Sequence, residues 1–233
     1  MIPIGDDNSA RVRTPVINYL LILTNILVFV YLQNIGTNEK VIASYSMIPG
    51  EILSGKDFTT EGLAVSPQPV YLTILSSMFM HGSIAHILGN MLYLWIFGDN
   101  LENVMGHFKY LLFYISCGIL ASMAHVWATD FFGRDLNIPC LGASGAIAGV
   151  LGGYLLLFPR NEVRVIFLRS ILAVPAFVTL GLWIGLQLLG GAMDFSGSGE
   201  KGGVAYAAHI GGIFVGLLLV KFFTSEQTTQ PEQ

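Results

Sequence analysis

Six apolar stretches follow one another along the chain, separated by polar segments. They cover residues 16–32, 84–97 (continuing towards 105), 110–128, 144–158, 170–191 and 204–223. The apolar residues lack the alternation typical of a half-buried strand, and lipid-exposed backbone must satisfy its own hydrogen bonds, so we interpret the stretches as helices. Four approach or reach the roughly 20 residues that a helix needs to cross a bilayer, whereas the second and fourth are shorter. The pattern predicts an all-α membrane protein with six transmembrane helices.

The composition agrees with this interpretation. Of the 233 residues, 53% are hydrophobic and only 11% are charged, whereas soluble domains contain about 25% charged residues. A soluble core of this size could not hide so much apolar surface. The two cysteines, Cys117 and Cys140, are too few for a disulfide framework, and we expect no bridge between them.

The basic residues predict the orientation, because cytoplasmic loops are enriched in Lys and Arg. One side of the six-helix arrangement receives Arg11, Arg13, Lys109, Arg160, Arg164 and Lys221. We expect that side and both termini to be cytoplasmic. The predicted organisation is a cytoplasmic N-terminal segment (1–14), a six-helix domain (15–223) and a polar C-terminal tail (224–233). Arg11 and Arg13 precede a run that is long for a signal peptide and lacks a following cleavage site, so we expect a retained span.

Polar residues inside the predicted spans are candidates for function, because they are expensive in lipid. If the fourth helix ends at Phe158, Ser144 lies 14 residues from that end, or about 21 Å at the helical rise per residue. If the sixth ends near Lys221, His209 lies 12 residues from it, or about 18 Å. A hydroxyl and an imidazole are therefore predicted at similar depth, nearer the outer face.

Stripes of small residues predict that these two helices pack closely. Small residues every fourth position let helix backbones approach each other in a membrane. The fourth helix has Gly145, Gly149 and Gly153 at this spacing, and the sixth has Ala208, Gly212 and Gly216. Such stripes can simply pack helices, but here each flanks a polar residue at matched depth.

The second helix contains further polar groups in "HGSIAHILGN". His86 and Asn90 are four residues apart and share one helix face, and both can donate hydrogen bonds. Such donors suit an oxyanion hole. A zinc site made by His81, His86 and His209 remains an alternative, although the HExxH pattern of zinc proteases is absent. We expect neither a metal nor another cofactor.

The motifs "HGSIAHILGN", "GASG" and "AHIGGIFVG", on successive spans in this order, resemble those of the rhomboid family of intramembrane serine proteases. The resemblance covers helices two to six, about two thirds of the chain. It implies a six-helix core with a water-filled cavity that opens outward. It also implies a Ser–His dyad that cuts other membrane proteins in or near their transmembrane segments.

The resemblance transfers roles to individual positions. Ser144 matches the nucleophile and His209 the general base. The side chains of His86 and Asn90 match the oxyanion donors. We expect the backbone N–H of Ser144, at the start of its helix, to be a further donor. Glu102 resembles an acidic residue below the second helix that ties loops together, and the glycines at 145, 149, 212 and 216 have a packing role.

Two positions depart from the family pattern. A Trp-Arg pair is common in the first outer loop, but "PVYLTILSSMFMH" has none. Many members place an aromatic residue four positions after the serine, against the catalytic imidazole. Ala148 occupies that position here, so His209 must be oriented by other packing.

The chemistry expected of these groups is acyl transfer. Ser144 begins a helix whose free N–H groups and dipole favour a developing oxyanion. Since no intramembrane acid is near His209 in sequence, we expect a dyad and not a triad. The predicted function is an intramembrane serine endopeptidase of the cell membrane. Its active site would open to the extracytoplasmic side, and its substrates would be single-span or multi-span membrane proteins.

Other functions remain open from the residues alone. An inactive relative that binds transmembrane clients should lack the serine or the histidine, yet both are present. A small transporter would use the polar residues to line a path. An aspartyl protease would need a second intramembrane carboxylate besides Asp99. The sequence has no basic patch for nucleic acid. The fifth stretch, with Pro175 inside it, is a candidate gate for substrate entry, but we favour the interpretation of Pro175 as a tolerated kink. We expect His81, Ser83 and the outer loop to line the cavity.

Overall fold

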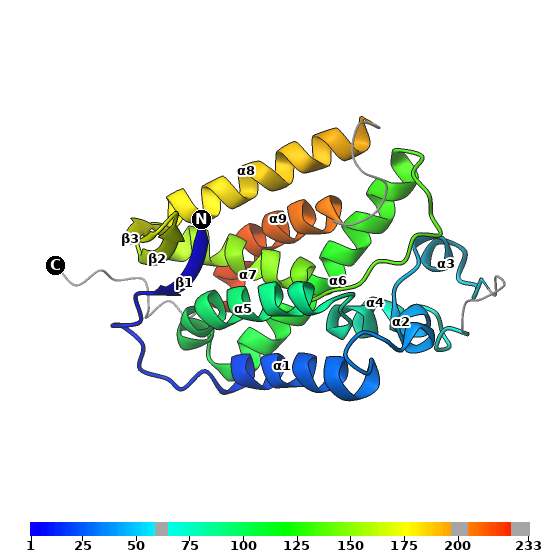
Figure 1. The fold of residues 1–233 in the computed structure, drawn as a ribbon, viewed down its shortest axis with the longest axis horizontal. Helices are drawn as coiled ribbons and strands as arrows, with labels where there is room; N and C mark the ends of the chain where they lie inside the picture. Colours follow the sequence, from blue (N-terminus) through cyan, green and yellow to red (C-terminus); the bar gives the residue numbers. More distant parts are fainter. Residues whose placement is uncertain (59–64, 197–204, 225–233) are drawn as a thin grey trace.

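The computed structural model describes residues 1–58, 65–196 and 205–224, and these residues form a mainly helical bundle (Figure 1). Helix α1 runs along one edge of the bundle and α8 along the opposite edge, with α5, α6, α7 and α9 between them (Figure 1). Short helices α2 to α4 lie at one end and a small sheet at the other. The helices are α1 (Val16–Leu27), continued by the π-helical turn η1 (Val28–Leu32), α2 (Glu39–Tyr45), α3 (Pro49–Ser54), α4 (Leu72–Ser76) with the 3-10 turn η2 (Ser77–Phe79), α5 (Ile84–Met105), α6 (His107–Phe131), α7 (Ser144–Leu157), α8 (Ala176–Phe195) and α9 (Tyr206–Phe223).

Three helices in the described residues are long and apolar enough to cross a membrane, namely α6, α8 and α9. A fourth candidate span is the bent pair formed by Leu72–Phe79 and α5, whose two parts meet at 90°. The first helix with its π-helical turn and α7 are apolar but shorter. The protein is therefore a helical membrane protein, while the count of six spans and the cytoplasmic termini stay predictions.

Helix α7 is short and lies inside the bundle. Ten of its 14 residues are buried. A Cβ atom on Gly212 would overlap the Gly145 carbonyl oxygen, and one on Gly216 would overlap that of Gly149. The backbones of α7 and α9 are therefore in direct contact along the two predicted stripes.

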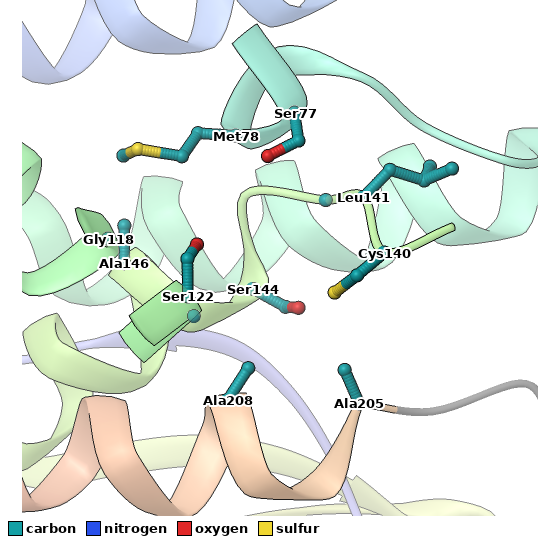
Figure 2. Close-up of a pocket in the computed structure, with 12 residues that line it drawn as sticks. Ser77, Met78, Gly118, Ser122, Cys140, Leu141, Ser144, Ala146, Ala205 and Ala208 are labelled. Carbon is teal, nitrogen blue, oxygen red and sulfur yellow. The ribbon is translucent and has the colours of Figure 1, made fainter. Parts of the chain in front are cut away.

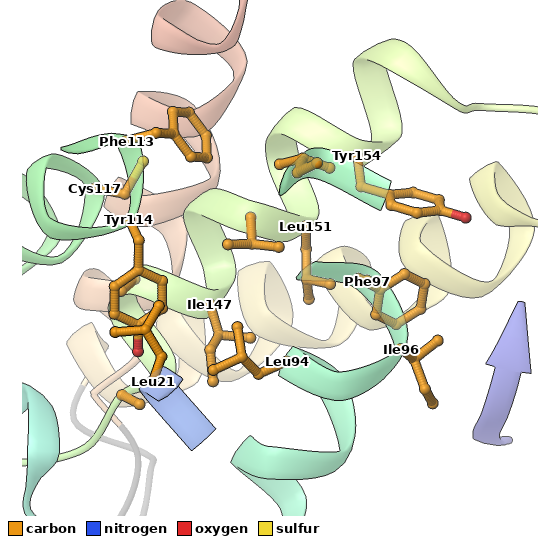
Figure 3. Packing of buried hydrophobic residues seen from close by; sticks show 14 of the residues in the cluster. Leu21, Leu94, Ile96, Phe97, Phe113, Tyr114, Cys117, Ile147, Leu151 and Tyr154 are labelled. Atoms are coloured by element: carbon orange, nitrogen blue, oxygen red, sulfur yellow. The ribbon is translucent and has the colours of Figure 1, made fainter. Parts of the chain in front are cut away.

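The core surrounds this contact and draws on α1, α5, α6 and α7, with further residues from α8 and α9. Figure 3 shows Ile147 and Leu151 of α7 packed among apolar side chains of α1, α5 and α6. Cys117 of α6 is buried in the same cluster, and both cysteines are free thiols.

The prediction that the fold is all helix was wrong at the start of the fifth stretch. Residues 170–175 belong to strand β3 (Ser170–Pro175), which pairs antiparallel with β2 (Glu162–Phe167). Val163 and Val165 are buried while their neighbours are exposed, which is the period of a strand. Pro175 is accordingly not a kink inside a helix, because it stands immediately before α8 with a ψ of 145°.

The predicted N-terminal segment also belongs to this sheet. Residues 2–6 form β1 (Ile2–Asp6), which pairs antiparallel with β2 and completes a three-stranded sheet in the order β1-β2-β3. Its last residue, Asp6, is buried and accepts hydrogen bonds from the Tyr154 hydroxyl (2.6 Å) and the Asn100 amide (2.7 Å). This burial raises the pKa of Asp6 from its ordinary value of 3.8 to about 7.

Glu102, near the end of α5, holds the start of α1. Its fully buried carboxylate accepts hydrogen bonds from the backbone N–H groups of Ile17 (2.9 Å) and Asn18 (2.7 Å), and it also contacts the His107 ring. The first turn of α1 has no acidic residue and its N-cap, Pro15, supplies no side-chain bond. A carboxylate from another helix therefore satisfies these free donors.

The α7–α9 contact predicts an asymmetric effect of two glycine substitutions. Gly216→Ala should destabilise the protein by about 1–3 kcal/mol or more, because the added methyl overlaps a backbone carbonyl that cannot move aside. The matched control is Gly185→Ala on α8, where no atom of the described residues lies within 4 Å of the added methyl. Thermal unfolding in detergent should show a lower melting temperature for the first variant and little change for the second. Equal melting temperatures would contradict the close packing.

The burial of Asp6 predicts a pH dependence of stability. The folded pKa of Asp6 lies above that of the unfolded chain, so its stabilising effect is complete below about pH 4 and is lost as the pH rises through about 7. Asp6→Asn stays neutral throughout. The melting temperature of this variant relative to the native protein should therefore rise between pH 5 and pH 8. A difference that does not change with pH would show that Asp6 titrates normally.

Candidate active site

Ser144 and His209 meet between α7 and α9. Ser144 is the first residue of α7, His209 lies in the first turn of α9, and the Ser144 Oγ is 2.8 Å from the His209 Nε2. Both residues are partly buried. The structure thus brings together the two groups that were placed at similar depth from the sequence, and the glycine contacts one and two turns further along explain how the helices come so close.

The loop before Ser144 needs a glycine. Gly142 has a φ of +128°, a conformation that residues with a side chain rarely adopt. A Cβ atom there would lie 2.8 Å from the His86 Nε2, so the imidazole of α5 lies against the backbone that leads to Ser144. The Gly142 N–H donates to the Ser77 carbonyl oxygen (2.9 Å), which ties this loop to η2. Gly142 was not singled out from the sequence.

The other predicted oxyanion residue, Asn90, has a partner that the sequence did not indicate. Its Nδ2 lies 2.9 Å from the His81 Nε2, and both side chains are buried. The His81 backbone is held in turn by the Gln33 side chain, which accepts from its N–H (3.0 Å) and donates to its carbonyl (2.7 Å). The rings of His81 and His86 are in edge contact with their centroids 5.1 Å apart. In the part of the chain that the structure describes, no three His, Cys, Asp or Glu side chains converge as metal ligands.

Helix α8 supplies two contacts to His209 that the sequence analysis missed. The His209 Nδ1 lies 2.7 Å from the Gln187 Oε1. The Trp183 ring covers the imidazole with a centroid distance of 5.8 Å and an angle of 34°. The available signal was a single polar residue inside the apolar run "WIGLQLLGG".

A small cavity adjoins the Ser144 side chain (Figure 2). Its volume of about 20 Å³ is sufficient for one water molecule. Figure 2 shows the Ser144 hydroxyl between Ser77 on one side and Ala205 and Ala208 of α9 on the other. Neither His81 nor Ser83 is among the residues around this cavity, whereas Cys140 and Leu141 from the loop before α7 are. The residues around it also include Ser77, Ser122, Gly142 and Ala208.

Comparison with known proteins identifies the family. The model of the Rhomboid domain matches residues 68–226 of the chain. This match spans α5 to α9 and includes Ser144 and His209. The chain therefore belongs to the rhomboid family.

Individual relatives come from mitochondria and from bacteria. The chain is 33% identical over 148 residues to "Rhomboid protein 1, mitochondrial" of Saccharomyces cerevisiae, covering 63% of this chain and 40% of that protein. It is 29% identical over 210 residues to "Rhomboid protease GluP" of Bacillus subtilis, covering 88% of this chain and 35% of that protein. The human "Presenilin-associated rhomboid-like protein, mitochondrial" is 29% identical over 157 residues, 64% of this chain and 37% of that protein. The matched part is thus less than half of each of these longer proteins.

Proposed function

We propose that this protein is an intramembrane serine endopeptidase that cleaves peptide bonds in or near the transmembrane segments of other membrane proteins. The observation that supports this most directly is the 2.8 Å contact between the Ser144 hydroxyl and the His209 imidazole. A hydroxyl within hydrogen-bond reach of an imidazole is the arrangement of an activated nucleophile. One relative, from Bacillus subtilis, is named a rhomboid protease.

The proposed reaction begins when Ser144 attacks the carbonyl carbon of the scissile peptide bond. His209 takes the hydroxyl proton at Nε2 as the C–O bond forms. The same proton passes to the leaving amine when the C–N bond breaks, and the acyl group remains on Ser144. A water molecule, deprotonated by His209, then attacks the ester carbonyl carbon. The C–O bond to Ser144 breaks as His209 returns the proton to the serine oxygen, and the acyl group leaves as a carboxylic acid.

The negative charge of the tetrahedral intermediate would be stabilised at the start of α7. Among the described residues, no side chain caps this end of the helix, so its first N–H groups, beginning with that of Ser144, would be available to an oxyanion. His86 lies against the adjoining Gly142 and is the first side-chain donor in the proposal. Asn90 is the second, and its hydrogen bond to His81 defines the orientation from which its amide would act.

The proposal includes a location. We propose a multi-pass protein of the cell membrane with six spans, both termini in the cytoplasm, and a site that opens to the extracytoplasmic side. The distribution of Lys and Arg between the two sets of loops supports this orientation.

The first test removes each member of the dyad. Ser144→Ala and His209→Ala should each reduce cleavage of a reconstituted single-span substrate by at least about 10³-fold, because each loses the nucleophile or its base. Thr24→Ala, which removes an exposed hydroxyl on α1, is the matched control and should cleave normally. Labelling of the native protein by a fluorophosphonate, and its loss in Ser144→Ala, measures the nucleophile directly. Cleavage that survives in Ser144→Ala would refute the proposal, and native protein that neither cleaves nor is labelled would favour a binding or transport function.

The second test concerns the substrate. A peptide bond inside a helix is shielded by the helical hydrogen bonds, so the substrate must unwind locally before Ser144 can reach it. Replacing a Gly near the cut by Leu should slow cleavage by about fivefold, because Gly is about 1 kcal/mol poorer in a helix. The same replacement at the far end of the substrate helix is the control. Equal rates for the two substrates would show that unwinding is not required.

A further inference from the structure

Gln187 lies on the opposite side of the His209 ring from Ser144. The two ring nitrogens each have one partner, Ser144 Oγ at Nε2 (2.8 Å) and Gln187 Oε1 at Nδ1 (2.7 Å). From this geometry we propose that Gln187 is the positioning residue of the dyad. The proposal rests on the proposed function, because it assigns a role within the same reaction.

The protonation state of the ring requires an acceptor at Nδ1. To accept the Ser144 proton, Nε2 must present its lone pair, so the neutral ring has its proton on Nδ1. The Gln187 amide oxygen accepts that proton in a hydrogen bond and selects this tautomer. When His209 becomes an imidazolium during the reaction, the Nδ1–H bond persists and the amide dipole stabilises the new charge. A neutral amide thus performs the orienting task that a carboxylate performs in a triad.

Trp183 completes this support from the same helix. It lies four residues before Gln187 and therefore on the same face of α8. Its ring covers the imidazole of His209 and also contacts Tyr93 of α5, with centroids 6.2 Å apart. With Ala148 in place of an aromatic residue, α7 supplies no aromatic contact to the imidazole. Trp183 of α8 supplies such a contact instead. The tryptophan limits tilting of the ring, whereas the glutamine determines its tautomer and rotation.

The location of Gln187 has a consequence for the reaction. Helix α8 lies at the periphery of the bundle. Of its 20 residues only four are buried, namely Ala176, Thr179, Leu180 and Gly191. In the described parts of the chain, no atom lies within 4 Å of a Cβ atom built on Gly181 or Gly185. Both supports of His209 therefore come from a peripheral helix, and His209 is held for proton transfer only while α8 is packed against α9.

The test compares side chains of similar length at position 187. Gln187→Met keeps the volume but removes the acceptor, and it should lower kcat by about 10- to 100-fold while KM changes by less than about twofold. Gln187→Glu keeps an acceptor oxygen at the same distance and should recover at least about tenfold over the Met variant. Gln187→Asn, whose amide is one methylene shorter, should fail to reach Nδ1 and behave like the Met variant. Leu186→Met is the matched control on the exposed face of α8 and should match the native enzyme.

A spectroscopic measurement separates positioning from packing. In protein with 15N-labelled histidine, the His209 signals, identified by their loss in His209→Ala, should report the Nδ1–H tautomer in the native enzyme and in Ser144→Ala. They should report mixed tautomers in Gln187→Met. Equal kcat for the Met variant and the native enzyme, equal loss in the Met and Glu variants, or an unchanged tautomer would overturn the role of Gln187. Because the native enzyme and Ser144→Ala are assayed alongside, an inactive native protein would instead overturn the proposed function.

Discussion

The backbones of α7 and α9 are in contact along their glycine stripes, and the arrangement of the candidate site depends on that contact. At Gly212 and Gly216 even a methyl group would overlap a carbonyl oxygen of the facing helix. Because the two helices lie so close, even a short side chain on one helix can reach the other. Ser144 on α7 can therefore form a hydrogen bond with the His209 imidazole on α9. With larger residues in the stripes, the same two groups would be separated by the added width of the side chains.

The remaining parts of the site are held by polar contacts between elements that are distant in sequence. Gln33, after the first helix, holds the backbone of His81, which in turn holds Asn90. Glu102 caps the start of α1 from the other end of α5. Helix α5 is thus attached to the first helix near both of its ends, and its two candidate donors occupy a defined position relative to α7. In an apolar environment such hydrogen bonds are strong and specific, because no water competes for them.

Much of this arrangement could be predicted from the sequence, for physical reasons. Long apolar runs located the main helices because a bilayer selects for length and hydropathy, and a constant rise per residue placed Ser144 and His209 at similar depth. Strands β2 and β3 were missed because β2 is only six residues long and β3 begins an otherwise helical run. Gln187 was visible in the sequence as an isolated polar residue. Its contact with His209 could not be predicted, because it depends on how α8 packs against α9.

The β1 strand has a consequence for the order in which the molecule can be completed. Residues 2–6 are synthesised well before their partner strand, β2, which begins at Glu162. Strand β1 must therefore remain unpaired while the residues between it and β2 are being synthesised. It joins the sheet only after Ser144 has been translated, because Ser144 precedes β2 in the chain.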